Sequence, residues 1–267
     1  VSVLGVVGTA AWMAITGGAG IPLVHEQRVP MDYAFPVVLS FVAQYVDATL
    51  GMGYGTTLTA LLVMLGFPVT EVVIAVLLQQ LLAGGIASLA HHALGNADLH
   101  PGSFHFRLAM LLGGLGLVGG LIAAGMAVAM PISMLDRVIG VVIVVMGLVI
   151  LLARRAHLRF SWWRAGVLGV VAGANKGFMG GGYGPIVVAG QIAAGDNMRH
   201  AVAVTALAEA LSCVGGIAGY IIMGARMPWA LTGALVMGGI IASILAAATV
   251  RALPAGGLKS VVGVVYL

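Results

Sequence analysis

Long apolar runs with very few charges between them constrain this chain more than any other feature. Only 7% of its residues are Asp, Glu, Lys or Arg, against about 25% in an average soluble domain. So few charges cannot cover a surface that faces water, which excludes the soluble globular, disordered and nucleic-acid-binding classes. Isolated strands would leave backbone groups unpaired in lipid. The sequence therefore predicts an all-α polytopic membrane protein.

The apolar runs also predict how many times the chain crosses the membrane. A spanning helix needs about 20 apolar residues, so we expect a single transmembrane domain (1–267) with roughly 7–9 spans. Two apolar segments, 56–67 and 185–194, are too short to span. Each follows a glycine cluster, Gly51–Gly55 in one case and Gly180–Gly184 in the other. These segments are predicted to be re-entrant or half-length helices, because glycine-rich backbone unwinds easily.

The two glycine clusters belong to an internal repeat. Gly53-Tyr54-Gly55 recurs as Gly182-Tyr183-Gly184, and the same offset in numbering pairs Leu39 with Leu168 and Gly66 with Gly195. The offset holds without a gap over about sixty residues, and repeat architectures show such a fixed period. We predict repeat one over residues 33–153 and repeat two over residues 162–267.

The distribution of arginine predicts the orientation of the repeats. Loop 154–164 carries four arginines, which places it in the cytoplasm by the positive-inside rule. Counting spans outward puts Arg107, Arg199, Arg251 and Lys259 on the same side, and Arg28, Arg137 and Arg226 on the other. Each repeat then makes an odd number of crossings, so the repeats are inverted relative to each other. Inverted repeats are typical of secondary transporters.

The glycine breaks are candidate binding sites for an anion. A break exposes the free N–H groups of a half-helix N-terminus, which attract negative charge. The alternative is that the glycines serve only close helix packing. Candidate substrate-binding residues come from the breaks and from nearby amides: Gly53, Tyr54, Gly55, Gly182, Tyr183, Gly184, Gln44, Gln80 and Asn175.

Three charged residues lie deep inside apolar segments, where charges are costly and commonly functional. The offset of the repeat pairs Asp47 with Lys176, and it pairs Gln80 with Glu209. Lys176 could attract an anion, while Asp47 and Glu209 could couple the movement of protons. The alternatives are a structural ion pair between Asp47 and Lys176, and a neutral Glu209 that hydrogen-bonds nearby backbone.

No metal site, cofactor or enzymatic activity is expected from the motifs. His91, His92, Asn96, Asp98, His100 and His105 cluster near the end of one apolar segment. Their spacing fits no closed zinc site, so we interpret them as solvated residues at the membrane interface. The sequence contains no Gly-x-Ser-x-Gly, His-Glu-x-x-His or Walker motif, which argues against an enzyme or an ATP-driven pump.

Residues 43–89 and 166–211 together resemble the TauE/SafE family of membrane permeases. Each stretch has a small-residue segment, a glycine-rich break, a short apolar helix, a turn and a span rich in Ala, Val and Thr. The resemblance implies transport of small sulfur-containing anions, such as sulfite, thiosulfate or sulfonates, across the cytoplasmic membrane of a prokaryote. The implied partners are the lipid bilayer and the anion, with no nucleic acid. A homo-oligomer is left open.

Two other functions remain open from the sequence. A cation or metal permease could use Asp47, Glu209 and the histidines. A membrane subunit without transport activity could anchor a partner enzyme, and large soluble loops would favour that function. The longest polar stretch is near 154–164.

Overall fold

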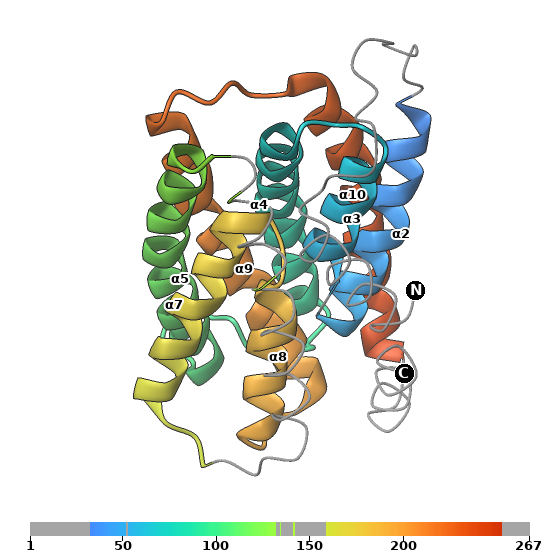
Figure 1. Cartoon of the computed structure of the whole chain (residues 1–267). Helices are drawn as coiled ribbons and strands as arrows, with labels where there is room; N and C mark the ends of the chain where they lie inside the picture. Colours follow the sequence, from blue (N-terminus) through green and yellow to red (C-terminus); the bar gives the residue numbers. More distant parts are fainter. Residues whose placement is uncertain (1–32, 52, 132–133, 135–140, 142–158, 253–267) are drawn as a thin grey trace.

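The computed structural model describes residues 33–51, 53–131, 134, 141 and 159–252, and the elements of this part of the chain are α-helices without any strand. Figure 1 shows how they are arranged. In chain order they are α2 (Ala34–Leu50), α3 (Tyr54–Met64), α4 (Val69–Ala93), α5 (Phe104–Ala129), α7 (Trp162–Met179), α8 (Tyr183–Ala193), α9 (Met198–Ile222) and α10 (Trp229–Ala252). The all-α class predicted from the sequence is confirmed for these residues.

Four of the helices are long enough to cross a membrane. Helices α4, α5, α9 and α10 have 24 to 26 residues, and each contains a sufficiently apolar window. At 1.5 Å per residue they measure about 36–39 Å, more than the roughly 30 Å of a bilayer's hydrocarbon core. The predicted 7–9 spans also drew on the apolar segments 1–24, 138–153 and 258–267. These lie outside the described residues or almost entirely so.

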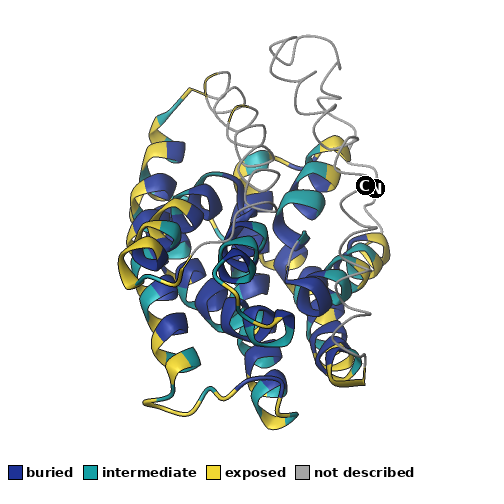
Figure 2. Ribbon diagram, turned by 90° about the horizontal axis from the view of Figure 1, so that it is seen from below, coloured by how far each residue is buried: buried dark blue, intermediate teal, exposed yellow. Residues whose placement is uncertain are grey.

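The outer faces of the helices are apolar. On α10, Met237, Ile241 and Ile244 are exposed, and their spacing puts them on one face. Trp163 and Trp229 are 79% and 70% exposed. Figure 2 shows the buried residues gathered inside and the exposed residues around the outside. Such a surface would be unfavourable in water and suits contact with lipid.

In two pairs of consecutive helices, a glycine break separates the first helix from the second. Helix α2 ends before Gly51 (φ 72°), and α3 begins after Gly53 (φ 109°). Helix α7 ends before Gly180 (φ 70°), and α8 begins after Gly182 (φ 80°). These left-handed conformations cost glycine little and other residues more. The sequence therefore stops both helices at points that the predicted repeat makes equivalent.

The two broken pairs enter the molecule from opposite ends. In Figure 1, α2 runs from the upper end to the middle and α3 returns upward, whereas α7 rises from the lower end and α8 returns downward. Helices α3 and α8 have eleven residues each, or about 17 Å, roughly half of the hydrocarbon core. They begin two residues earlier than the segments 56–67 and 185–194 predicted from the sequence.

The helices of the first half pack on those of the second. Helix α5 lies against α7 and α9, α10 lies against α2 and α4, and α4 lies against α9. Small residues permit these contacts, because a Cβ atom on Gly173 would overlap the backbone of Gly116. Close backbone approach at glycine is common between membrane helices. The two halves therefore share one interior.

Candidate functional site

The two glycine breaks meet inside the molecule. A Cβ atom on Gly55 would overlap the carbonyl oxygen of Gly180, and one on Gly181 would overlap the backbone nitrogen of Thr56. The backbones of the two breaks are therefore in direct contact. Only glycine allows this approach, so the contact explains why both clusters are rich in that residue.

Each break also packs on the short helix of the other half. A Cβ atom on Gly51 would lie 2.6 Å from Val188 in α8, and one on Gly180 would lie 3.4 Å from Thr59 in α3. The offset of the predicted repeat pairs Gly51 with Gly180, and it pairs Thr59 with Val188. The contacts of the two breaks thus involve equivalent positions in the two halves.

Side chains from α4 and α9 bind free carbonyl groups just before the breaks. The Nε2 of His91 lies 3.1 Å from the oxygen of Ala48, and the hydroxyl of Tyr220 donates to the oxygen of Gly177 over 3.0 Å. The amide nitrogen of Asn96 lies 3.0 Å from Nδ1 of His91. A carbonyl only accepts and this amide nitrogen only donates, so His91 carries its proton on Nε2 and is neutral. The helix ends are thereby satisfied.

The burial of His91 and Asn96 corrects one expectation from the sequence. Both were predicted to be solvated interface residues, and both are buried. Asn96 also donates to the carbonyl oxygen of Ala247 in α10. These two polar side chains therefore hold α2, α4 and α10 together.

Lys176 and Glu209 form a buried ion pair. The Nζ of Lys176 lies 2.5 Å from Oε1 of Glu209, and the two residues are 0% and 6% exposed. Lys176 stands in the last turn of α7, just before the break, and Glu209 stands in the middle of α9. The repeat in the sequence suggests Asp47 as a structural partner of Lys176. In the structure the direct partner of Lys176 is Glu209.

Asp47 occupies the N-terminal end of α3. Its Oδ1 accepts a hydrogen bond from the backbone nitrogen of Tyr54 over 3.3 Å, and a carboxylate is favoured at this positive end of a helix. The equivalent residue in the second half is Lys176, which cannot accept a hydrogen bond. The two breaks therefore differ in charge: a carboxylate stands beside the first, and a cation stands beside the second.

A small cavity lies between these groups. Its polar lining comes from Gln44, Asp47, Gln80, Thr205 and Glu209, and its apolar lining from Ala48, Gly51, Gly84, Ala87, Val202 and Ala206. The cavity volume is about 10 Å³, which is room for about one water molecule. The buried Oε1 of Gln80 has no hydrogen-bond partner among the described residues. The cavity thus offers one acceptor oxygen that the described residues leave unsatisfied.

Two further amides predicted as ligands have different surroundings. The Oε1 of Gln44 accepts from Nε2 of Gln79 over 3.1 Å, and Gln44 lines the cavity. The Nδ2 of Asn175 donates to the carbonyl oxygen of Gly181 over 3.1 Å. Asn175 therefore holds the second break in shape, while its buried Oδ1 has no partner among the described residues.

The tyrosine hydroxyls lie away from the cavity. The hydroxyl of Tyr54 is 3.0 Å from the hydroxyl of Ser40, which donates to the carbonyl oxygen of Leu235 in α10. The hydroxyl of Tyr183 lies against Gly116 in α5. Neither tyrosine is among the residues that line the cavity.

Of the residues predicted from the sequence, the structure gathers five around the cavity: Gln44, Asp47, Gln80 and Glu209 in its wall, and Lys176 through its bond to Glu209. Gly53 and Gly182 are the N-caps of the short helices, and Gly55 and Gly184 stand in their first turns. Asn175, Tyr54 and Tyr183 support the breaks or pack beside them.

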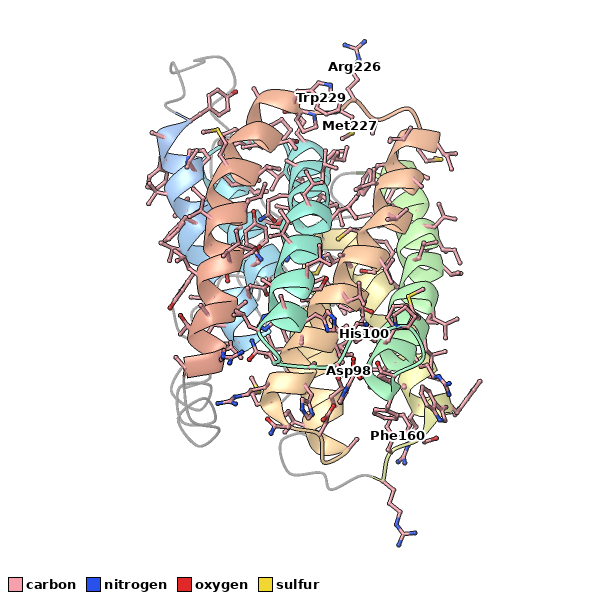
Figure 3. The ribbon with its side chains drawn as sticks, turned by 180° about the vertical axis from the view of Figure 1, so that it is seen from behind. Asp98, His100, Phe160, Arg226, Met227 and Trp229 are labelled. Atoms are coloured by element: carbon pink, nitrogen blue, oxygen red, sulfur yellow. The ribbon has the colours of Figure 1, made fainter. Side chains whose placement is uncertain are left out.

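Gln191 is a polar residue that the sequence analysis did not select. Its Nε2 donates to Oγ1 of Thr205 over 3.0 Å, and Thr205 lines the central cavity. Gln191 also lines a second cavity of about 160 Å³, together with Phe104, Leu108, Phe160, Ala194, Gly195 and Asp196. This cavity lies at the end of the molecule where Figure 3 labels Phe160. A glutamine inside the short apolar helix was the available signal.

Comparison with known proteins connects this architecture to one family. The model of the family described as sulfite exporter TauE/SafE matches residues 37–267, which include both breaks and the cavity residues. A protein of Bacillus subtilis (strain 168) described as the probable membrane transporter protein YtnM is 25% identical over 226 residues. The alignment covers 79% of this chain and 73% of the relative. No solved structure matches the chain.

Proposed function

Because the chain belongs to the sulfite exporter TauE/SafE family of membrane transporters, we propose that it is a secondary transporter of small sulfur-containing anions. The expected substrates are sulfite, thiosulfate or an organosulfonate. The observation that carries this proposal is the fully buried Lys176, which stands one turn before the second glycine break. A buried cation beside a half-helix N-terminus is an arrangement that favours an anion.

The anion is held at the second break in this proposal. Lys176 supplies a positive charge, and the N-terminus of α8 supplies backbone N–H groups around Gly182–Gly184. At the first break the equivalent end of α3 already receives the carboxylate of Asp47. At the second break the residue at the equivalent position is a cation, Lys176, which leaves that helix end to a sulfite-like group from outside. Gln80 lines the central cavity together with Glu209, the partner of Lys176, and supplies an amide there.

Glu209 couples the anion to a proton. In the described conformation Glu209 neutralises Lys176, so a substrate anion must compete with it. Protonation of Glu209 removes the competing charge and frees Lys176. The anion therefore binds to Lys176 when Glu209 holds a proton. Asp47 lies in the wall of the same cavity as Glu209 and is the second candidate to carry the coupled proton.

Inverted repeats over 33–153 and 162–267 provide alternating access to this site. The opposite entry of the two broken pairs (Figure 1) and the equivalent contacts of the two breaks support the proposal. The central cavity has room for about one water molecule and is too small for a sulfur oxyanion, so transport requires this region to open. Rocking of one repeat against the other would open the site to one side at a time, across the cytoplasmic membrane of a prokaryote.

The first test replaces the buried cation. Lys176→Met should abolish sulfite flux in proteoliposomes, because the anion loses its positive partner. This change leaves Glu209 buried without a partner, at a cost of about 3–5 kcal/mol. The double variant with Lys176→Met and Glu209→Gln removes that cost and should fold, again without flux. Arg226→Met is the control, because Arg226 is an exposed cation at the end of the molecule opposite to Phe160. Wild-type flux in the folded double variant would reject the site.

A cation permease is the second candidate function. It is favoured by the presence of two carboxylates, Asp47 and Glu209, beside the single cation Lys176. Competition experiments separate the two functions. Excess sulfite should block flux of a labelled sulfur anion, whereas a divalent cation should leave it unchanged. The opposite result would favour the cation permease.

A further inference from the structure

A group of three side chains of types that can bind a metal ion lies outside the lining of the central cavity. His105 is in the first turn of α5, His200 is in the first turn of α9, and Asp196 is in the turn between α8 and α9. One ligand atom from each residue lies within 4.8 Å of the others. The group joins α5 of the first half to α9 of the second, at the end where Figure 3 labels Asp98, His100 and Phe160.

The spacing of these atoms is close to that of a tetrahedral metal site. Zinc binds histidine nitrogen and carboxylate oxygen at about 2.0–2.2 Å, so neighbouring ligand atoms in a tetrahedron lie about 3.4 Å apart. The Nδ1 of His200 is 3.2 Å from Oδ1 of Asp196. The ring of His105 contacts that of His200, with centroids 4.4 Å apart. The three ligand atoms lie within 4.8 Å of one another, so they must approach by up to about 1.4 Å to reach this spacing.

The carboxylate of Asp196 carries an oxygen that the described residues leave unsatisfied. Its Oδ1 accepts from the backbone nitrogen of Asn197 over 2.7 Å and faces His200. Its Oδ2 is buried and has no hydrogen-bond partner among the described residues, although the side chain as a whole is 17% exposed. An unsatisfied buried acceptor is costly. A cation held by both oxygens of the carboxylate would satisfy it.

We propose that His105, Asp196 and His200 bind a divalent transition metal ion, with Zn²⁺ as the best-fitting probe. Two imidazoles and one carboxylate form a ligand set that zinc and similar metals accept, with one coordination position left open. Asp196 also lines the cavity of about 160 Å³, so a water molecule has room at the open position. The site is separate from Asp47 and Glu209, and its ion is a resident ligand.

The bound metal acts as a clamp between the two halves. It fixes the start of α5 to the start of α9, beside the larger of the two cavities. Opening of this end in a transport cycle would pull the ligands apart. The metal is therefore expected to stabilise the closed arrangement of this end and to slow flux.

Equilibrium dialysis of the full-length protein without a histidine tag, followed by metal analysis, tests the site. The wild type should bind one Zn²⁺ per chain, and Zn²⁺ should raise its unfolding temperature. His105→Asn, Asp196→Asn and His200→Asn should each weaken binding more than about 10-fold, since losing a ligand costs more than losing its support. His100→Asn is the matched control, because His100 contacts His92 at the same end and is not in the group.

Two results would overturn the metal site. One is the absence of stoichiometric Zn²⁺ binding by the folded wild type. The other is binding that survives all three ligand substitutions or is lost equally in His100→Asn. Lys176→Met should keep its Zn²⁺ affinity, so failure of the anion proposal and failure of the metal proposal are distinguishable.

Discussion

At the scale of single residues, the proposed transport site contains two acidic side chains and one basic side chain. Asp47, Lys176 and Glu209 are all buried, and each charge inside a bilayer costs roughly 2.5–3.5 kcal/mol by insertion scales. The ion pair of Lys176 with Glu209 and the bond of Asp47 to the end of α3 offset part of that cost. A set with two carboxyl groups and one cation is the basis of the proton exchange proposed above.

Glu209→Gln should remove the pH dependence of sulfite flux. In the proposed mechanism Glu209 carries the coupled proton, so the wild-type flux depends on pH. The glutamine stays neutral at every pH, so flux should be high and flat across the range. Flux into proteoliposomes between acidic and alkaline pH measures this. Glu71→Gln, an exposed carboxyl at the start of α4, should keep the wild-type profile. A pH profile unchanged by Glu209→Gln would exclude Glu209 from coupling.

At the scale of elements, the decisive feature is the contact between the two glycine breaks. Each break is formed by positive-φ glycines that end one helix, α2 or α7, and start a half-length helix, α3 or α8. The breaks can touch because Gly55, Gly180 and Gly181 carry no side chain. A hydrogen bond from His91 or Tyr220 holds the helix end before each break. The geometry of the site thus depends on how the α2–α3 break packs against the α7–α8 break.

Gly55→Ala should destabilise the protein and reduce flux. Its Cβ would collide with the backbone of Gly180, which cannot move without separating the breaks, and overpacking of this kind costs about 1–3 kcal/mol. Gly85→Ala is the control, because a Cβ atom there meets nothing within 4 Å and alanine favours a helix by up to about 1 kcal/mol over glycine. Thermal unfolding in detergent measures both. Equal unfolding temperatures for the two variants would argue against close contact of the breaks.

At the scale of the whole molecule, the two halves are interlocked. Helix α5 covers α7 and α9, and α10 covers α2 and α4. The labelled residues Arg226 and Phe160 lie at opposite ends of this assembly (Figure 3). Arg159 and Arg164 flank the start of α7 beside Phe160, so the arginine-rich end is predicted to face the cytoplasm.

Cysteine labelling in intact cells tests this orientation. In a Cys213→Ala background, Arg226→Cys should react with a membrane-impermeant maleimide. Phe160→Cys should react only after the membrane is permeabilised. Cys213 itself is buried, so its removal takes away a background thiol at a protected position. Reaction of Phe160→Cys alone in intact cells would reverse the orientation, and reaction of both would contradict a membrane between the two ends.

The helical class, the short helices and the positions of the breaks could all be predicted from the amino-acid pattern. Apolar length and glycine clusters are local signals, so the starts of helices α3 and α8 were predicted closely. The sequence also selected Asp47, Lys176 and Glu209, because a charge within an apolar run is visible without coordinates. It overestimated the extent of the breaks, since Gly55 and Gly184 lie within helices. Glycine permits unwinding without requiring it.

The folded structure was needed to show which groups contact one another. It gave Lys176 its partner Glu209 from another helix. It also placed the buried side chain of His91 against the carbonyl oxygen of Ala48. It placed His105 close to Asp196 and His200. Hydrophobic periodicity tells which residues lie in an apolar helix, but not which neighbouring helix they touch. That choice depends on how the glycine-lined backbones of two interlocked halves pack, and this packing is a long-range property of the folded chain.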